Sequence, residues 1–283
     1  MAEESKLLGV LNVKIIGSGK PTLVLAHGFG SDQSVWQYIL PYLVAHYKVI
    51  VFDMVFSGKV DPKNFDFDRY TSLSAYAADL LSILDELKID KCLYVGHSVS
   101  GMVGCLASIE RPELFERLIL LCASPRYLNE ESYHGGFERG EVDSLYYALK
   151  SHYAAWASGF APLAVGVDEP SVVEEFRRTM MNMKPEIALA VAKTIFESDM
   201  RSILCDVKTP CSIIQTAKDI VVPMAVPYHM QGNLGGKMNS VIILDAEGHL
   251  PQLTAQDLLL QAVKLILEGS KMVLEPTVQN ANI

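Results

Sequence analysis

Short apolar runs recur along the chain, and each ends in Gly, Asp or a small polar residue. Runs without polar alternation are typical of strands buried on both faces of a parallel sheet. They predict six strands, within 21–28, 47–53, 92–98, 116–124, 211–219 and 240–249. Apolar residues at helical spacing predict helices over 73–87 and 257–267. This alternation predicts an α/β fold with a mostly parallel, doubly wound sheet and right-handed crossovers.

The alternation stops after Pro125 and resumes near residue 199, and the segment between reads as helical. We therefore predict a core of residues 1–125 and 199–269, an inserted helical lid of residues 126–198, and a flexible tail of residues 270–283. The inserted segment is rich in aromatic residues. These residues could form a small core of the inserted segment, or they could form the wall of an apolar pocket. The two interpretations are compatible. The aromatic residues are Tyr127, Tyr133, Phe137, Tyr146, Tyr147, Tyr153, Trp156, Phe160, Phe176 and Phe196.

Charge and composition narrow the function classes. The chain has 283 residues, a net charge of −9 and no Lys/Arg stripe. An acidic surface argues against nucleic acid or an anionic membrane as the main partner. The N-terminus MAEESK lacks a following apolar stretch, and no apolar run reaches the ~18 residues that span a bilayer. These features predict a protein without a secretory signal or a membrane span.

The five cysteines are odd in number and show no C-x-x-C spacing. Neither a disulfide framework nor a metal site is predicted, and no cofactor is expected. Unpaired cysteines favour a reducing environment, so we expect the protein in the cytoplasm and nucleus.

The stretch Gly96-His97-Ser98-Val99-Ser100 matches most of the pattern G-x-S-x-G, and Gly101 follows it. The pattern alone is weak evidence, because glycine and serine are common residues. Its context is more specific, since Ser98 follows an apolar strand and precedes a helical segment. A strand, a sharp turn and a helix around a serine form the nucleophile elbow of α/β-hydrolases. We therefore predict Ser98 as a nucleophile.

A serine hydroxyl needs a base to take its proton, and in this fold the acid and then the histidine follow the serine along the chain. Asp219 ends the run 211–219, and His249 follows the next strand. Both positions are carboxyl ends of strands, where active sites of open α/β sheets lie. His249 is predicted as general base and Asp219 as the residue that orients it. Taken singly, each could be an ordinary loop residue.

The segment His27–Gly30 after the first strand predicts part of an oxyanion hole. The N–H groups of Phe29 and Val99 would donate to the oxyanion. We interpret His27 as a structural hydrogen-bonding residue, His97 as a packing residue and Asp53 as a residue that shapes its loop.

With these residues in place, the chain resembles the plant α/β-hydrolase receptors for karrikins and strigolactones, and is closest to the karrikin-receptor branch. The resemblance runs from NVKIIGSG to EGHLPQL, and its most specific stretches lie outside the triad. They include HGFGSDQSVW, FDFDRY, ASPRY, GFAPLAVG, TIFESDMR and KDIVVP.

The resemblance implies a four-helix lid over an apolar pocket with Ser98 at its floor, and slow hydrolysis of butenolide ligands. It also implies ligand-dependent binding to a leucine-rich-repeat F-box protein and a Clp-ATPase-like repressor, with Gly159 and Pro162 on the partner-binding face of the lid. The implied pocket residues are Phe29, Tyr127, Phe137, Leu145, Trp156, Phe160, Phe176 and Phe196.

The chain departs from the family pattern at Met54–Lys59, where relatives carry smaller residues, and at Gly101, where alanine is common. These departures put the ligand in doubt more than the fold. Two other functions remain open: an ordinary carboxylesterase or lactonase, and a binding protein with a vestigial triad. Triad chemistry alone cannot separate a receptor-hydrolase from a metabolic esterase.

Overall fold

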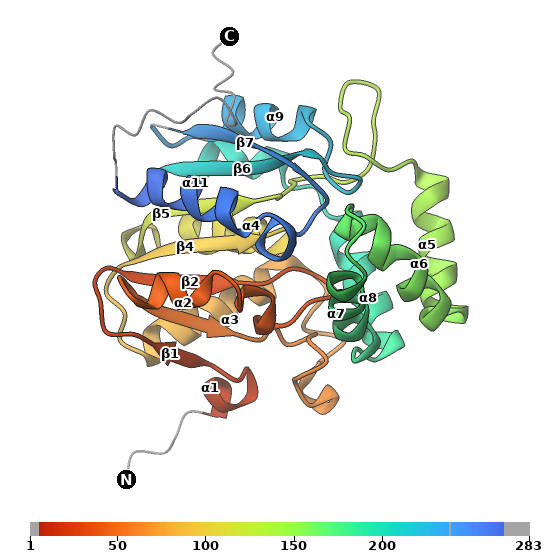
Figure 1. Cartoon of the computed structure of the whole chain (residues 1–283), viewed down its shortest axis with the longest axis horizontal. Helices are drawn as coiled ribbons and strands as arrows, with labels where there is room; N and C mark the ends of the chain where they lie inside the picture. Colours follow the sequence, from red (N-terminus) through yellow and green to blue (C-terminus); the bar gives the residue numbers. More distant parts are fainter. Residues whose placement is uncertain (1–5, 238, 269–283) are drawn as a thin grey trace.

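The computed structural model describes residues 6–237 and 239–268, and the predicted tail of residues 270–283 lies outside them. The fold is an α/β sheet flanked by helices, as the apolar runs predicted (Figure 1). The sheet order is β1-β3-β2-β4-β5-β6-β7, with β1 antiparallel to β3 and the other pairs parallel. The strands are β1 Lys14–Ile16, β2 Thr22–Ala26, β3 Lys48–Phe52, β4 Cys92–His97, β5 Phe115–Leu121, β6 Cys211–Lys218 and β7 Ser240–Glu247.

Each central strand contributes to two apolar cores, because successive side chains point to opposite faces. In β4, Cys92 and Tyr94 join one core while Leu93 and Val95 join the other. The first core packs against α3, α4 and α9, and the second packs against α2 and α11, which lie in front of the sheet in Figure 1. The core helices are α1 Lys6–Val10, α2 Leu40–Val44, α3 Leu73–Glu86, α4 Val99–Glu110, α9 Ala225–Asn233, α10 Pro251–Thr254 and α11 Gln256–Glu268.

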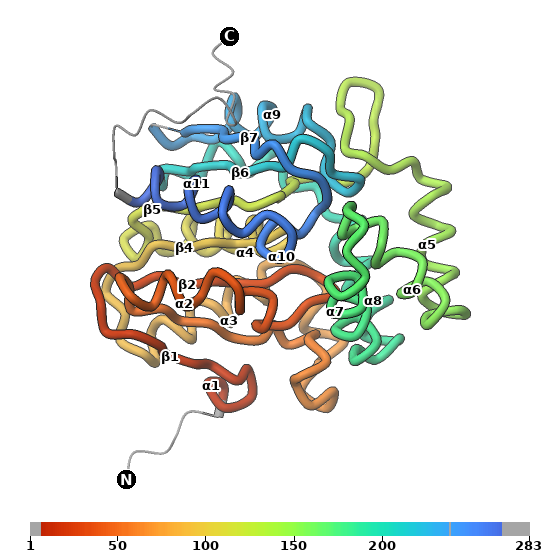
Figure 2. The backbone as a smooth tube through the Cα atoms, viewed as in Figure 1, coloured from red at the N-terminus to blue at the C-terminus, as the bar shows by residue number. Residues whose placement is uncertain are grey.

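Four helices between β5 and β6 form a separate layer at one end of the sheet, and we call them the lid. Figure 2 shows the chain passing from β5 through a long loop into α5, and returning from the lid to β6. The lid helices are α5 Arg139–Ser151, α6 Tyr153–Val165, α7 Pro170–Met181 and α8 Pro185–Glu197. They lie within the predicted segment 126–198, at the carboxyl ends of the parallel strands.

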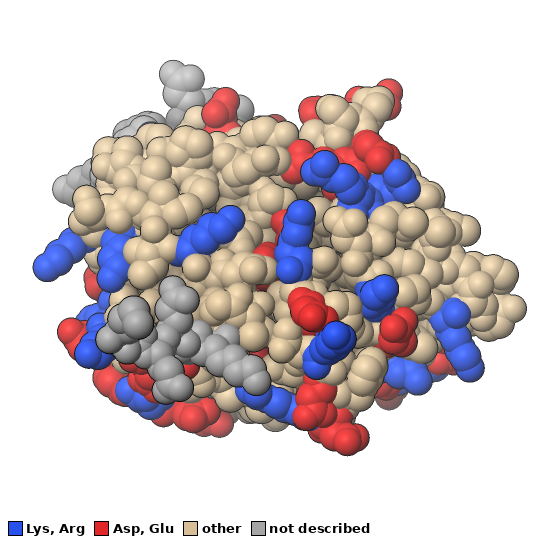
Figure 3. Space-filling view, turned by 90° about the horizontal axis from the view of Figure 1, so that it is seen from below, with Lys and Arg blue, Asp and Glu red and all other residues tan. Residues whose placement is uncertain are grey.

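Four short 3-10 helices complete the described elements: η1 Gln33–Trp36, η2 Pro62–Asn64, η3 Pro112–Leu114 and η4 Arg201–Asp206. No helix in the described part of the chain is both long and apolar enough to cross a membrane. On the face seen in Figure 3, basic and acidic side chains are interspersed. That face therefore offers no single-sign stripe for nucleic acid.

Candidate active site

Ser98 lies at the sharp turn between β4 and α4. Its backbone has φ 56° and ψ −126°, a conformation that non-glycine residues rarely adopt. The turn is fixed from both sides, since the Ser98 N–H donates to the Leu121 carbonyl and the Gly101 N–H donates to the Ser98 carbonyl. Gly101 allows a close packing contact, because a Cβ there would lie 2.4 Å from the Cβ of Ala123. The geometry is that of a nucleophile elbow.

His249 bridges Ser98 and Asp219. Its Nε2 lies 2.9 Å from Ser98 Oγ, and its Nδ1 lies 2.8 Å from Asp219 Oδ2. Because the carboxylate accepts the Nδ1–H, the other ring nitrogen is free to accept the serine proton. Ser98 and His249 are each 7% exposed. The three residues meet from the ends of β4, β6 and β7, although 151 positions separate the serine from the histidine.

Asp219 is held as an acceptor on both carboxylate oxygens. The Val221 N–H donates to Oδ1 at 2.8 Å, and Gln215 Nε2 donates to Oδ2 at 3.0 Å. Burial raises the pKa of Asp219, but His249 and these donors outweigh that effect and lower it below its usual value. Asp219 therefore stays ionised and keeps the imidazole in the tautomer that catalysis needs.

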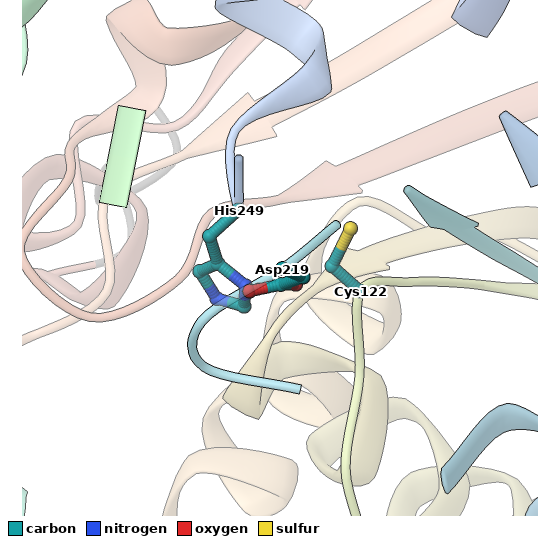
Figure 4. Close-up of side chains that lie close together, drawn as sticks. All are labelled: Cys122, Asp219 and His249. Carbon is teal, nitrogen blue, oxygen red and sulfur yellow. The ribbon is translucent and has the colours of Figure 1, made fainter. Parts of the chain in front are cut away.

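Cys122 lies beside Asp219 and His249, at the end of β5 (Figure 4). One ligand atom from each of the three residues falls within 4.8 Å of the others. However, His249 Nδ1 and Asp219 Oδ2 are bonded to each other, and burial raises the pKa of the Cys122 thiol well above its usual value. Because His249 bonds to Asp219 through one ring nitrogen and to Ser98 through the other, this group of side chains suits a triad better than an ion.

Two segments beside Ser98 carry the predicted oxyanion donors. Val99 is the first residue of α4, so its N–H belongs to a helix turn whose amides have no acceptor within the helix. Phe29 lies in the turn Gly28–Ser31 after β2, where a Cβ on Gly28 would be 3.0 Å from Ser98 Cβ. Two amides in this arrangement can stabilise a negative charge that develops on a carbonyl oxygen bound at Ser98.

Three polar residues near the triad have structural contacts. His27 accepts the Met54 N–H on Nε2 at 2.9 Å, and Asp53 accepts from Gln33 and Asn12. His97 packs its ring 4.9 Å from that of His249, and its Nε2 lies 2.8 Å from the His249 carbonyl. Burial, followed by the proximity of His249, lowers the pKa of His97 to about 3. A neutral His97 therefore supports the catalytic loop without competing for its proton.

A narrow pocket with a cavity volume of about 40 Å³ lies above Ser98, between the sheet and the lid. The structure brings the eight pocket residues named from the sequence into its wall, together with Ser98 and His249. Trp156 and Phe160 stack with ring centroids 5.2 Å apart, and Tyr127 places its hydroxyl 3.4 Å from Ser98 Oγ. The lining residues are Phe29, His97, Ser98, Tyr127, Phe137, Leu145, Trp156, Phe160, Phe176, Ile195, Phe196, Val221 and His249.

Ile195, Val221 and His97 are wall residues that the sequence analysis did not assign to the pocket. Ile195 precedes Phe196 on α8, and Val221 follows Asp219 by two positions, so their neighbours in sequence were the available signal. The lining carries no Lys, Arg, Asp or Glu, and its hydroxyl and imidazole groups are those of Ser98, Tyr127, His97 and His249. Such a wall favours a ligand with an apolar body and one reactive polar group.

The lid contacts the histidine loop through its backbone. The His249 N–H donates to the Ala164 carbonyl at 2.7 Å, near the end of α6. Gly159 and Pro162 lie on the same helix and are exposed, and Leu163 beside them is 58% exposed. One side of α6 thus contacts the catalytic loop, while another faces solvent.

Comparison with known proteins agrees with this geometry. The family model described as alpha/beta hydrolase fold matches residues 21–256. A hydrolase from Oleispira antarctica superposes with a TM-score of 0.89 at 34% identity, covering 94% of this chain and 97% of the other. An enol-lactonase from Burkholderia xenovorans shares the fold, with a TM-score of 0.80 at 20% identity over 91% of this chain and 96% of the other.

Curated plant proteins are more similar in sequence. A strigolactone esterase of Pisum sativum is 54% identical over 262 residues, which cover 92% of this chain and 98% of that protein. The karrikin insensitive 2 receptor IA of Petunia hybrida is 53% identical over 253 residues, which cover 89% and 92%. The chain therefore belongs to the α/β-hydrolase family and, within it, to the plant family of strigolactone esterases and karrikin insensitive 2 receptors.

Proposed function

We propose that this protein is a receptor-hydrolase, which binds a butenolide signal, cleaves it slowly at Ser98 and then recruits signalling partners. The observation that carries the catalytic part is the pair of hydrogen-bond distances at His249, 2.9 Å to Ser98 and 2.8 Å to Asp219. An assembled triad under an apolar pocket favours hydrolysis over a binding protein with a vestigial site.

The chemistry follows from the geometry. His249 takes the Ser98 proton as Oγ attacks the ester or lactone carbonyl, and the Phe29 and Val99 amides receive the oxyanion. His249 then protonates the leaving oxygen, and water releases the acyl group from Ser98 by the reverse sequence. The aromatic wall supplies apolar contact area for the remainder of the ligand. Karrikin-like and strigolactone-like butenolides both fit this description.

The receptor part rests on the family and on the exposed side of α6. The proposed partners are a leucine-rich-repeat F-box protein and a Clp-ATPase-like repressor, which would dock near Gly159, Pro162 and Leu163 in the cytoplasm and nucleus. Support comes from the exposure of these three residues on a helix that also contacts the His249 loop. A helix that is exposed on one side and bonded to the His249 loop on the other could report the state of the active site to a partner.

The experiment compares the parent protein with Ser98→Ala, using both mirror-image forms of a synthetic butenolide. We expect Ser98→Ala to lose at least about a thousandfold in hydrolysis, because triad members act as a unit. Ser108→Ala is the matched control, since Ser108 is a buried serine of α4, the helix that follows Ser98, and its hydroxyl donates to the Cys105 carbonyl.

Hydrolysis by Ser98→Ala within tenfold of the parent would exclude Ser98 as the nucleophile. A butenolide-dependent pull-down of the F-box protein then separates a receptor from an ordinary carboxylesterase or lactonase. Fast turnover without ligand-dependent capture of the partner would favour the metabolic enzyme.

A further inference from the structure

The last turn of lid helix α7 packs directly on the turn after β2. The Thr179 hydroxyl donates to the Gly30 carbonyl at 2.7 Å, with the Phe176 carbonyl as an alternative acceptor at 2.8 Å. The Phe176 carbonyl is within a helix and has the Met180 amide as its regular partner. Of the hydrogen bonds within the described residues, that from Thr179 is the one that the buried Gly30 carbonyl accepts. The Gly30 carbonyl therefore depends on the lid.

This turn carries the Phe29 amide. It is closed by the Ser31 N–H, which lies 3.4 Å from the Gly28 carbonyl, and Gly30 has φ +79°. A Cβ on Gly30 would lie 2.9 Å from Met180 Cγ and 3.3 Å from Phe176 Cζ, so α7 rests against the backbone of the turn. The Gly30 carbonyl shares one planar peptide group with the Ser31 N–H, and the Gly28 carbonyl shares another with the Phe29 N–H. Because the Ser31 N–H bonds to the Gly28 carbonyl, rotation of the peptide held by Thr179 would also change the direction of the Phe29 N–H.

The end of α7 is itself held in place. The Tyr153 hydroxyl, from α6, donates to the Met180 carbonyl at 2.6 Å. The Phe29 ring also lies 6.3 Å from that of Trp156, on the same helix. Two lid helices thus fix the oxyanion turn, one through its backbone and one through its side chain.

We propose that Thr179 is a positioning residue for the oxyanion hole, and that its hydroxyl couples the placement of the lid to the direction of the Phe29 N–H. Thr179 does not touch the substrate; it acts through the Gly30 carbonyl. The proposal deepens the proposed hydrolysis at Ser98 and rests on it. When the lid leaves its closed position, the bond to Gly30 breaks and the oxyanion hole loses one fixed donor. Turnover is therefore slower when the lid is displaced than when it is closed.

The test uses Thr179→Val, which removes the hydroxyl at nearly constant shape, and Thr179→Ser, which keeps it. Thr194→Val is the matched control, because Thr194 on α8 likewise donates to a core carbonyl, that of Tyr70, away from the oxyanion turn. Each protein is assayed with p-nitrophenyl acetate after titration of its active serine. Phenylboronic acid, whose tetrahedral Ser98 adduct mimics the oxyanion, is the second probe.

We expect Thr179→Val to lose about tenfold in kcat per active site with KM within twofold, because loss of an oxyanion donor costs about 100- to 1,000-fold and displacement costs less. Boronate affinity should fall in parallel. Thr179→Ser and Thr194→Val should stay within twofold of the parent. If Thr179→Val does not fold, Thr179→Ala gives the same comparison.

A Thr179→Val enzyme within twofold of the parent in kcat would overturn this inference and leave the proposed function standing. An equal loss in Thr194→Val would also overturn it, since the effect would then be general to the lid. Absence of hydrolysis by the parent would overturn the proposed function and this inference together.

Discussion

At the scale of single residues, the site depends on keeping one histidine reactive and two others neutral. His27 and His97 are fully buried, and burial lowers the pKa of each. Both lie close to the triad. An extra positive charge there would oppose the imidazolium that forms on His249. Their neutrality therefore serves catalysis, and it has a consequence for stability.

We expect the protein to lose stability as pH falls from about 6.5 toward 5. The folded-state pKa of His97, about 3, is below its unfolded value of about 6.5, so the unfolded chain binds a proton that the folded chain does not. The stabilisation is complete above pH 6.5 and declines by about 1.4 kcal/mol per pH unit for each such histidine. His27 contributes in the same direction.

Urea unfolding at a series of pH values measures this dependence. His97→Asn is the informative variant, because its unfolding free energy should vary with pH by about one proton less than that of the parent. A free energy of unfolding that is constant between pH 6.5 and 5 would show that these histidines are not held neutral.

At the scale of elements, the loop of residues 54–60 packs against the oxyanion turn through Phe56. Phe56 is 2% exposed and packs edge-on against Phe29, His27 and Tyr76, with ring centroids 6.3, 5.8 and 5.7 Å apart. Phe56 is not itself a lining residue of the pocket. We therefore expect changes at Met54–Lys59 to affect the ligand indirectly, through the placement of Phe29.

We predict that Phe56→Ala lowers the free energy of unfolding by about 3–5 kcal/mol, as large-to-small core changes do, and also alters the ranking of ligands by size. Phe115→Ala is the control, since Phe115 is a buried phenylalanine at the start of β5, with its ring 6.1 Å from that of Tyr94. Ester series of increasing chain length, assayed on both variants, measure the ranking. Identical rankings in the parent and Phe56→Ala would show that the loop affects stability alone.

The sequence predicted the long buried elements and missed the short or exposed ones. The six parallel strands were accessible because each contains consecutive apolar residues, at least three in all but β6. Strand β1 escaped because it has three residues with a mostly exposed pattern, and its pairing with β3 is a tertiary contact. Helix α9 escaped because its sequence, AVPYHMQGN, contains proline and glycine and lacks an apolar stripe.

The same distinction applies to the site. Ser98, Asp219 and His249 follow strand ends, so the fold dictates their proximity once the strands are identified. The hydrogen bond from Thr179 to Gly30 could not be read from the sequence, because it joins residues 149 positions apart across the lid and the core. Such contacts depend on how the inserted helices settle on the sheet, which local patterns do not encode.

At the scale of the whole molecule, the lid is joined to both catalytic loops. Helix α6 accepts the His249 N–H through Ala164, and α7 donates to Gly30 through Thr179. A rearrangement of the lid would therefore disturb the histidine loop and the oxyanion turn together. The proposed receptor function requires such a link, because reaction at Ser98 has to change the lid surface that a partner contacts.

The most direct measurement is a thermal-shift titration of the parent and Ser98→Ala with a butenolide panel, combined with single-turnover kinetics. A ligand that only binds the native state raises the melting temperature by mass action. We expect an active butenolide to lower the melting temperature of the parent, because reaction at Ser98 favours a loosened lid, and to cause no such drop in Ser98→Ala. Turnover should be well below the ~10 per second of typical enzymes. Stabilisation of the parent by every hydrolysed ligand, together with fast turnover, would contradict the receptor account and favour a metabolic esterase.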